Sequence, residues 1–318
     1  MAKAVLDFEK PIFALEQKIR EMEIMSTQTE VDMTPEIEKL KEKLTELAHK
    51  TNKNLTRWQR VELARHPDRP HSKDYIDRIA TRWTELHGDR LFRDDHAILT
   101  GLAMIGDQRV VIVAQEKGRS TKEKLYHNFG MPNPEGYRKA MRTMQMAEKF
   151  HLPVISLIDT QGAYPGLEAE ERGQAEAIAR NLLIMSKLRV PIICVVIGEG
   201  ASGGALGIGV GDRLLMMENT WYSVITPEGC ASILYRDANQ KEKAAEAMKL
   251  SAQDLLDMKI ADKIIHEPLG GAHRDYDAAA KSLEIVLTEE IKKLAVLDED
   301  ELVNTRIEKL SRIGVWEE

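Results

Sequence analysis

A hydrophobic strand that runs into a glycine loop occurs three times in this chain, and this repeat constrains the fold more than any other feature. The strands lie at residues 110–113, 154–158 and 192–197, followed by Gly118, Gly162 and Gly198. Helical patterns at 136–150 and 170–187 separate them. This order requires parallel strands joined by right-handed crossovers, and near-continuous Val and Ile runs are typical of strands covered on both faces. The sequence therefore predicts an α/β core.

Helical periodicity marks the amino-terminal part of the chain. Apolar residues recur every three or four positions at 12–22 and again at 37–47, which predicts two amphipathic helices. A polar stretch at 26–30 predicts a linker between them. We interpret residues 1–60 as a helical hairpin that forms an interface arm, and residues 61–318 as the main domain with a carboxy-terminal helical tail.

Two further helical stretches complete the predicted elements. Helical spacing resumes at 75–86 and ends at a turn that begins with Gly88. The charged stretch 277–312 predicts two helices, which we expect to pack on the main domain or to contact another subunit.

Charge and composition narrow the class of protein. The chain has 318 residues, with 45 Lys and Arg against 52 Asp and Glu, so its net charge is −7. Its basic residues form no tract that could follow a phosphate backbone, so we do not expect nucleic acid as a main partner. The apolar stretch at 190–197 is far shorter than the about 20 residues that cross a bilayer, and the acidic amino end does not fit a signal peptide. We expect a cytoplasmic protein.

The cysteines argue against a metal or redox centre. Cys194 and Cys230 are too far apart for a CxxC motif or a zinc knuckle. We expect both to be reduced and structural, and we predict no metal site in this chain.

The densest glycine run, at residues 198–209, follows the third strand directly. Small residues allow backbone N–H groups to approach a ligand closely, and a helix that begins there adds the positive end of its dipole. An anionic oxygen is therefore the expected ligand, and three interpretations fit these residues.

A dinucleotide site is the first interpretation. Gly198, Gly200 and Gly203 match the G-x-G-x-x-G pattern, and Glu218 lies about 20 residues on, where such proteins place a ribose-binding acid. That pattern normally opens the first βαβ unit, whereas two strand and loop units come first here. A dinucleotide-binding oxidoreductase therefore stays an alternative of low rank.

A serine hydrolase is the second interpretation. The residues around Ser202 match the nucleophile pattern G-x-S-x-G, and Asp262 followed by His266 or His273 comes in the order that hydrolases use. A small residue tolerated in a tight turn explains Ser202 equally simply.

An oxyanion hole made of backbone amides is the third interpretation, and it also explains a second glycine loop at residues 159–166. Neighbouring parallel strands would bring the amides of Gly162 and Ala163 close to those of Gly203 and Gly204. Two converging pairs of donors could stabilise a thioester enolate or a urea oxygen. A scaffold whose glycine loops are merely turns remains a non-enzymatic alternative.

Several stretches of the chain resemble a known family. Residues 190–204, 211–213 and 222–229 resemble the crotonase superfamily, which stabilises enolates of acyl-CoA thioesters. Nearly the whole chain is similar to the carboxyltransferase alpha subunits of bacterial acetyl-CoA carboxylase. The matching stretches are residues 63–67, 115–119, 128–132, 134–140, 159–166, 170–174, 202–204 and 267–274.

The resemblance implies an α/β crotonase-like fold of the ClpP/crotonase type, a superhelix of repeated strand-strand-helix units. It also implies transfer of a carboxyl group from carboxybiotin, held on a biotin carboxyl carrier protein, to acetyl-CoA, which gives malonyl-CoA for fatty acid synthesis. In the family the active site lies between alpha and beta subunits of an α2β2 assembly, which works with biotin carboxylase. The family's zinc belongs to the beta subunit, and no cofactor is bound covalently to alpha.

The resemblance also implies roles for particular residues. The family's glycine pair corresponds to Gly203 and Gly204, whose amides would stabilise the oxyanion on the biotin side, while a pair in the beta subunit serves the acetyl enolate. The released biotin can take the proton from the acetyl methyl group, so this subunit need not supply a base. Hydratases of the superfamily carry an acid where Ala205 to Gly207 stand, and Glu228 alone occupies the other acid position, so Glu228 is interpreted as structural.

Four further residues are candidates for substrate contact: Lys117, Arg119, Tyr164 and Ser202. Lys117 and Arg119, with Lys122 and Lys124, form a basic loop after the first strand that suits a phosphate or carboxylate, although a solvated helix start explains the loop equally well. Tyr164 could cover the biotin ring or simply pack, and Ser202 lies beside the glycine pair. These assignments accompany the catalytic amides of Gly203, Gly204, Gly162 and Ala163.

Overall fold

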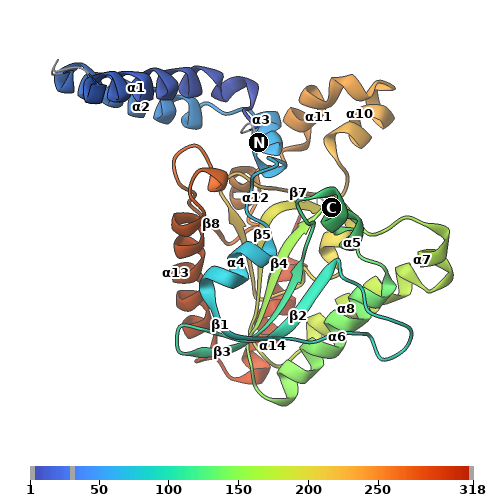
Figure 1. The fold of residues 1–318 in the computed structure, drawn as a ribbon. Helices are drawn as coiled ribbons and strands as arrows, with labels where there is room; N and C mark the ends of the chain where they lie inside the picture. Colours follow the sequence, from blue (N-terminus) through green and yellow to red (C-terminus); the bar gives the residue numbers. More distant parts are fainter. Residues whose placement is uncertain (1–3, 29–32, 315–318) are drawn as a thin grey trace.

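A mixed β-sheet forms the centre of the molecule in the computed structural model. Within residues 4–28 and 33–314, the part of the chain that the structure describes, the strands form one eight-stranded sheet in the order β1-β2-β3-β4-β5-β6-β8, with β7 paired to the end of β5 (Figure 1). β1, β2 and β3 pair antiparallel and the remaining pairs are parallel. The strands are β1 (Ala80–Glu85), β2 (Ile98–Ile105), β3 (Gln108–Gln115), β4 (Val154–Thr160), β5 (Ile192–Ala201), β6 (Arg213–Met217), β7 (Trp221–Ser223) and β8 (Lys263–Ile265).

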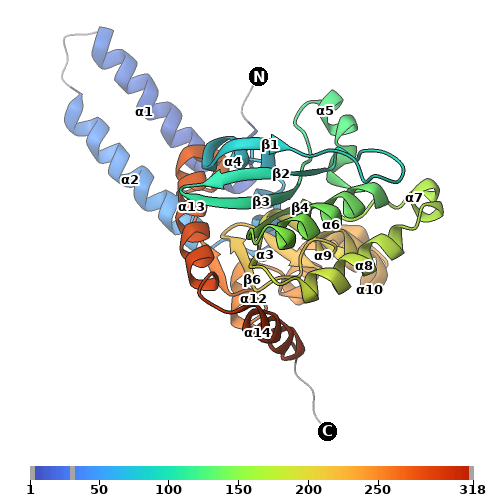
Figure 2. The ribbon, with the colours of Figure 1, turned by 90° about the horizontal axis from the view of Figure 1, so that it is seen from below.

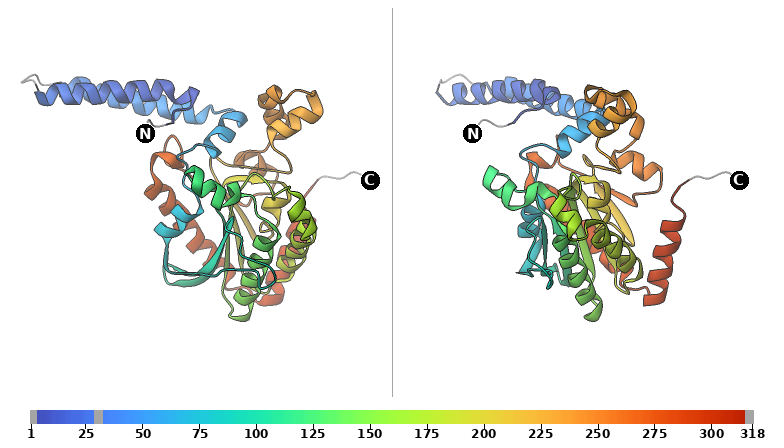
Figure 3. Two further views of the ribbon diagram at one scale, coloured as in Figure 1. Left: turned by 45° about the vertical axis from the view of Figure 1, so that its right-hand side comes forward. Right: turned by 90° about the vertical axis from the view of Figure 1, so that its right-hand side faces the viewer.

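Helices cover both faces of this sheet (Figures 1 and 3). Alternate residues of β5 pack into two separate apolar cores, because successive side chains of a strand point to opposite faces. α4 and α13 close one core, and α6 and α8 close the other. The helices are α1 (Lys10–Gln28), α2 (Thr34–Lys53), α3 (Arg57–Ala64), α4 (Ser72–Ile79), α5 (Thr121–Tyr126), α6 (Pro134–Lys149), α7 (Leu167–Glu171), α8 (Gln174–Lys187), α9 (Ser202–Leu206), α10 (Pro227–Tyr235), α11 (Lys241–Met248), α12 (Ala252–Asp257), α13 (Tyr276–Leu294) and α14 (Glu299–Ser311), with the 3-10 helices η1 (Asp7–Glu9), η2 (Asn128–Gly130), η3 (Ala238–Gln240) and η4 (Ala272–Arg274).

The three predicted strands are confirmed as β3, β4 and β5, which lie side by side and parallel. Val154 pairs with Val111 on one side and with Ile192 on the other. Every residue of β4 and β5 is buried, as expected for strands covered on both faces. Because parallel strands end at the same edge of a sheet, the glycine loops that follow β4 and β5 meet at one edge.

Two predicted helices differ from the structure. The helix predicted over 75–86 is wrong beyond Ile79, where α4 ends. Residues 80–85 instead form β1, which pairs antiparallel with β2. Thr81, Trp83 and Thr84 favour a strand, and this tertiary pairing outweighs the helical spacing. The helix predicted at 170–187 is divided into α7 and α8 at Gly173, whose φ of +81° interrupts it.

A long hairpin of α1 and α2 projects from the body (Figures 1 and 2). This confirms the two predicted amino-terminal helices. The predicted linker at 26–30 lies partly in α1, which extends to Gln28, and residues 29 and 30 are outside the described residues. The division of the chain at residue 60 stays a prediction. Among the described helices, none is long and apolar enough to cross a bilayer.

The carboxy-terminal helices predicted at 277–312 are α13 and α14, and a buried arginine holds the second one. Arg306 is fully buried on α14 and donates to both carboxylate oxygens of Asp212, at 2.8 Å each. The same guanidinium also donates to backbone carbonyls at the end of α8 and the start of β5, those of Met185, Leu188 and Val190. These bonds fix the tail beside the core.

Candidate active site at the glycine loops

The two glycine loops touch backbone to backbone. Thr160 at the end of β4 pairs with Gly200 near the end of β5, which sets the loops side by side. A Cβ placed on Gly204 would lie closer than 3.0 Å to the carbonyl carbon of Gly162 and to the nitrogen of Ala163. Real Cβ atoms do not approach backbone so closely, so this contact requires glycine at 204.

Three of the four predicted amide donors lack an acceptor. The N–H groups of Gly203 and Gly204 belong to the first turn of α9, where amides have no acceptor within the helix, and the described residues supply no other. The N–H of Ala163 has no acceptor there either. The N–H of Gly162 donates to Thr160 Oγ1 at 3.1 Å, so it is already engaged. In the loop that follows β4, the free amide donor is therefore that of Ala163 and not that of Gly162.

Gly203 differs from Gly204 in what surrounds it. The nearest atom to a Cβ at 203 would be Cδ1 of Ile178, at an ordinary 3.6 Å. The packing of the described chain therefore does not require glycine at this position. Glycine at 203 is therefore a candidate for close approach of a ligand to the free amides.

Ser202 occupies a strand-to-helix turn but has no catalytic partners. Its φ of +57° is left-handed, and its exposed side chain makes no hydrogen bond within the described residues. His273 donates to Glu9 and His266 lies 3.4 Å from Glu218 Oε2, so both predicted histidines are engaged elsewhere. Asp262 forms an ion pair with Lys309 and also accepts from the N–H of Leu214. The predicted triad is not assembled, and the hydrolase interpretation was wrong.

The dinucleotide interpretation was also wrong. Gly198 and Gly200 lie inside β5 and not in a phosphate-binding turn. A Cβ on Gly198 would clash with the carboxylate of Asp159, and one on Gly200 would clash with the ring of Tyr222. These glycines therefore serve close packing within the sheet.

A buried charge network lies beneath the loops, which the sequence analysis did not identify. Lys117 Nζ lies 2.6 Å from Asp159 Oδ1 and 2.8 Å from Glu199 Oε1. Arg65 bridges the other oxygen of Glu199 and the carboxylate of Glu228, at 2.6 Å each. Burial lowers the pKa of Lys117, but the two carboxylates outweigh it and raise that pKa. The bond to Arg65 supports the structural interpretation of Glu228.

The predicted basic loop is largely neutralised by acids. Lys117 belongs to the network, and Arg119 is paired with Asp74 and donates to the carbonyl of Arg69 at 3.2 Å. Lys122 and Lys124 on α5 are exposed and form no ion pair within the described chain. A cavity of about 240 Å³ adjoins the network, and its lining includes Arg65, Lys117, Lys124, Asp159, Gln161 and Glu199.

The ring of Tyr164 lies against Gly166, where any Cβ would come closer than 3.0 Å to the ring. Its backbone N–H donates to the carbonyl of Pro132 at 3.0 Å, and its carbonyl accepts from Gln174 Nε2 at 2.9 Å. These contacts hold the loop that carries Ala163, and the side chain is partly exposed near it.

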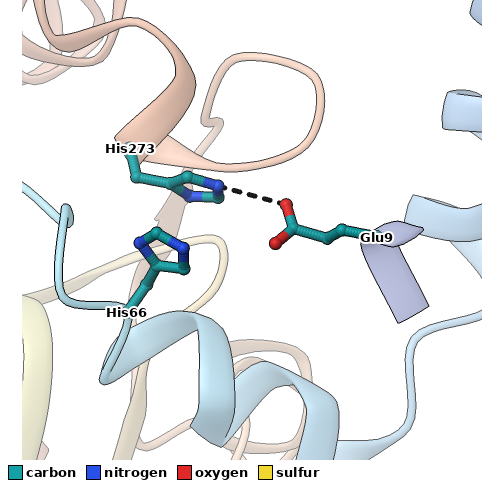
Figure 4. A group of neighbouring side chains, drawn as sticks. All are labelled: Glu9, His66 and His273. Carbon is teal, nitrogen blue, oxygen red and sulfur yellow. Dashed lines mark hydrogen bonds and ion pairs between the residues drawn. The ribbon is translucent and has the colours of Figure 1, made fainter. Parts of the chain in front are cut away.

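A cluster of two histidines and a carboxylate joins the amino-terminal segment to the body (Figure 4). The rings of His66 and His273 stack with centroids 4.0 Å apart, and His273 Nε2–H donates to Glu9 Oε1 at 3.1 Å. His66 is bonded at both nitrogens, because Nε2–H donates to Ala4 O and Nδ1 accepts from Asp68 N–H. Burial, followed by the nearby charge of His273, lowers the pKa of His66, which favours its neutral form.

Among the described residues, this cluster of Glu9, His66 and His273 could hold a metal ion. Each residue offers one potential ligand atom, and these atoms lie within 4.8 Å of one another. A metal ion would have to displace the hydrogen bonds to Glu9 and Ala4 that the facing nitrogens already make. Two histidines and a carboxylate suit zinc, but they already bond to one another and to the backbone. Within the described residues, only Nδ1 of His273 is left without a partner in this cluster. The absence of a metal site stays a prediction.

The family model and the curated relatives that match this chain agree on one family. The model of the family described as acetyl co-enzyme A carboxylase carboxyltransferase-like matches residues 5–314. The chain is 56% identical over 330 residues to the acetyl-coenzyme A carboxylase carboxyl transferase subunit alpha of Chlorobium phaeobacteroides (strain BS1), covering 99% of this chain and 98% of the relative. It is 54% identical over 313 residues to the subunit of that name in Methylococcus capsulatus, covering 98% of each.

Two solved structures share the fold at low sequence identity. The transcarboxylase 12S structure is similar over 71% of this chain and 41% of that chain, with a TM-score of 0.58 and 18% identity. The beta subunit of geranyl-CoA carboxylase from P. aeruginosa is similar over 77% of this chain and 46% of that chain, with a TM-score of 0.56 and 16% identity. The chain spans less than half of each solved chain. These likenesses confirm the predicted α/β crotonase-like fold.

Proposed function

This chain belongs to the acetyl-coenzyme A carboxylase carboxyltransferase alpha-subunit family, and on that premise we propose that it forms half of a shared active site with a beta subunit. The reaction we propose transfers the carboxyl group of carboxybiotin, carried on a separate protein, to acetyl-CoA and yields malonyl-CoA. The bond between the biotin nitrogen and the carboxyl carbon breaks, the acetyl methyl group loses a proton, and a carbon–carbon bond forms.

Negative charge develops on two oxygens during this reaction, the ureido oxygen of biotin and the thioester oxygen of the acetyl enolate. Backbone amides held in place before the reaction stabilise such charge without reorganisation. We assign the ureido oxygen to the amides of Gly203 and Gly204, and the enolate oxygen to the beta subunit. The released biotin nitrogen takes the proton, so this chain supplies no general base.

One observation carries this proposal: Gly204 lies directly against the peptide that joins Gly162 to Ala163. That contact gathers three amide donors at the carboxyl edge of the sheet, at Gly203, Gly204 and Ala163, for which the described residues supply no acceptor. Loss of one such donor costs roughly 3 to 4 kcal/mol of transition-state stabilisation in comparable sites. Gly162 has a structural part in the proposal, since its N–H is bonded to Thr160.

Substrate contacts belong to the proposal as well. Tyr164 lies on the loop of Ala163 and can line the mouth of the site. Ser202 is exposed at the start of α9, but its hydroxyl makes no substrate contact in this proposal. Lys117 and Arg119 are already paired with carboxylates, so each could contact an anionic substrate only in addition to its ion pairs.

The assembly that we propose follows from the family. It contains two alpha and two beta subunits, receives carboxybiotin from a biotin carboxyl carrier protein charged by biotin carboxylase, and works in the cytoplasm. Any zinc ion belongs to the beta subunit.

Malonyl-CoA formation from carboxybiotin and acetyl-CoA tests the proposed function. The chain is assayed alone, with a bacterial beta subunit, and as Gly203→Ala with that subunit. Gly203→Ala is the suitable variant because its methyl group meets only Ile178 at 3.6 Å, whereas any side chain at 204 would disturb the fold. Ser202→Ala is the matched control in the same turn.

We expect activity only in the mixture, at least about tenfold lower with Gly203→Ala and unchanged with Ser202→Ala. A wild-type mixture that associates but forms no malonyl-CoA would overturn the proposed function. Full activity of Gly203→Ala would remove this loop from the site.

A further inference from the structure

The side chain of Gln115 joins the two glycine loops from within the core. Gln115 ends β3, the strand next to β4, and is fully buried. Its Nε2 donates to the carbonyl of Gly204 at 2.8 Å, and its Oε1 accepts from the N–H of Asp159 at 3.1 Å. One planar amide side chain therefore bonds to α9 through its nitrogen and to the end of β4 through its oxygen.

The orientation of this amide is fixed by its partners. Rotating it by 180° would set its oxygen against the carbonyl oxygen of Gly204 and its NH₂ group against the N–H of Asp159, and both contacts would be repulsive. Gln115 supplies a donor and an acceptor at the spacing that the two loops require.

The peptides of α9 have few ways to rotate. The carbonyl of Gly204 accepts a second bond from the hydroxyl of Tyr137, at 3.2 Å, and the carbonyl of Gly203 accepts from the N–H of Gly207, at 2.9 Å. Because the C=O and N–H of one peptide point in opposite directions, a fixed Gly203 carbonyl also fixes the N–H of Gly204. The carbonyl of Gly204 belongs to the next peptide, so its two bonds hold the position of Gly204, while the bonded carbonyl of Gly203 sets the direction of the Gly204 N–H.

Asp159 links Gln115 to the buried charge network as well. Its Oδ1 accepts from the N–H of Glu199 at 2.9 Å and lies 2.6 Å from Lys117 Nζ. Gln115 therefore bonds the backbone of Asp159, and the side chain of the same residue connects β4 to β5.

We propose that Gln115 is a positioning residue for carboxyl transfer: it sets the distance between the Gly204 and Ala163 amides by bonding both loops at once. The proposal rests on the proposed function of those amides. A misplacement of about 1 Å in such a donor can cost up to about a hundredfold in rate without touching the substrate.

Gln115→Met tests this assignment, because Met fills a similar volume and removes both hydrogen bonds. Tyr137→Phe removes the other donor to Gly204 but leaves the link to Asp159. Ser156→Ala is the matched control, since Ser156 is a fully buried residue of β4 whose hydroxyl donates to a carbonyl, that of Ile208, without joining the two loops. Each variant is assayed with the beta subunit for kcat and KM, and for amide hydrogen exchange by mass spectrometry.

We expect Gln115→Met to lower kcat at least about tenfold while KM for acetyl-CoA changes less than about threefold. Amide exchange should rise in residues 159–166 and 201–207 together. Tyr137→Phe should lower kcat less, and Ser156→Ala should leave kcat unchanged. Thermal unfolding of each variant shows whether it remains folded under the assay conditions.

Comparison with Gly203→Ala separates this inference from the proposed function. Wild-type kcat in a folded Gln115→Met, together with a large loss in Gly203→Ala, would overturn the role of Gln115 and leave the site standing. An equal loss of kcat in Ser156→Ala would reduce Gln115 to general core packing and overturn its role too. If Gln115→Met does not fold, Gln115→Glu, which keeps the acceptor and loses the donor, must show the same loss of kcat with raised exchange only in 201–207.

Discussion

Gly204 packs against the nitrogen of Ala163 so closely that the peptide of one loop occupies the place of a side chain on the other. Gly203, the adjacent residue, has no such neighbour in the part of the chain that the structure describes, where a Cβ would meet Ile178 alone, at 3.6 Å. The two consecutive glycines thus differ in what the fold requires, because packing excludes a side chain at 204 and leaves room for one at 203.

Stability measurements should separate these two glycines. Gly204→Ala forces the loops apart and should lower the free energy of unfolding by about 1–3 kcal/mol or more. Gly203→Ala should change it by less than about 0.5 kcal/mol. Chemical denaturation of both variants checks this, and equal destabilisation would contradict the difference in packing.

Ser202 should prove dispensable. Its hydroxyl has no histidine or carboxylate partner in the described chain, because His273 is bonded to Glu9 and His266 lies beside Glu218. We expect Ser202→Ala to keep full carboxyltransferase activity and the wild-type chain to resist labelling by a fluorophosphonate. Stoichiometric labelling that Ser202→Ala abolishes would revive a nucleophilic role.

Lys117 should behave as a structural cation more than as an anion-binding residue. Its ammonium lies between Asp159 and Glu199, and its removal would leave two carboxylates in a buried site without their shared partner. Lys117→Met should cost about 3–5 kcal/mol in the free energy of unfolding.

Lys122→Met is the control for Lys117→Met, since Lys122 is exposed on α5, the helix that follows Lys117, and makes no ion pair in the described chain. It should change stability by less than about 0.5 kcal/mol. A Lys117→Met chain of normal stability with a raised KM for acetyl-CoA would instead indicate direct substrate contact.

Lowering the pH should remove the contribution that Glu116 makes to the free energy of unfolding. Burial opposes its ionisation, but a hydrogen bond and charge from His71, with N–H donors on Gly118 and Lys73, lower its pKa from 4.5 to about 2. The folded pKa is the lower one, so the stabilisation is present above pH 4.5 and is lost as the pH falls toward 2. It amounts to roughly 3 kcal/mol.

Comparison with Glu116→Gln measures this contribution. The wild-type chain should be more stable than the variant near neutral pH, and the difference should shrink as the pH falls below about 4.5. Urea unfolding of both chains over this range provides the measurement. A difference that stays constant with pH would show that Glu116 titrates normally.

The contact of Glu9 with His273 should hold the amino-terminal hairpin on the body. Glu9→Ala removes the bond to His273 and the one that the N–H of Leu6 donates. Limited proteolysis and hydrogen exchange should then increase in α1, whereas Glu21→Ala, on the exposed face of that helix, should have no effect. If a chelator added to the wild-type chain reproduced the Glu9→Ala result, the cluster would be a metal site instead of a hydrogen-bonded clamp.

The repeat of strand, glycine loop and helix determined the α/β core and the parallel order of β3, β4 and β5. These elements were predictable because burial on both faces selects continuous Val and Ile runs, and because helices require apolar residues at three- and four-residue spacing. The same residues placed the two glycine loops on adjacent strands. Residues 80–85 were not predictable, because their helical spacing is overruled by pairing with β2, a partner outside the local sequence.

Only the tertiary structure decided how the site is built from these parts. Nothing near Gly204 in the sequence states that Ala163 occupies its side-chain position, or that Gln115 on a third strand bonds both loops. The sequence likewise presented Lys117 and Arg119 as free cations, whereas carboxylates from distant elements neutralise them. Local patterns determine secondary structure because periodicity acts over a few residues, but hydrogen bonds and ion pairs depend on distances that exist only once the chain has folded.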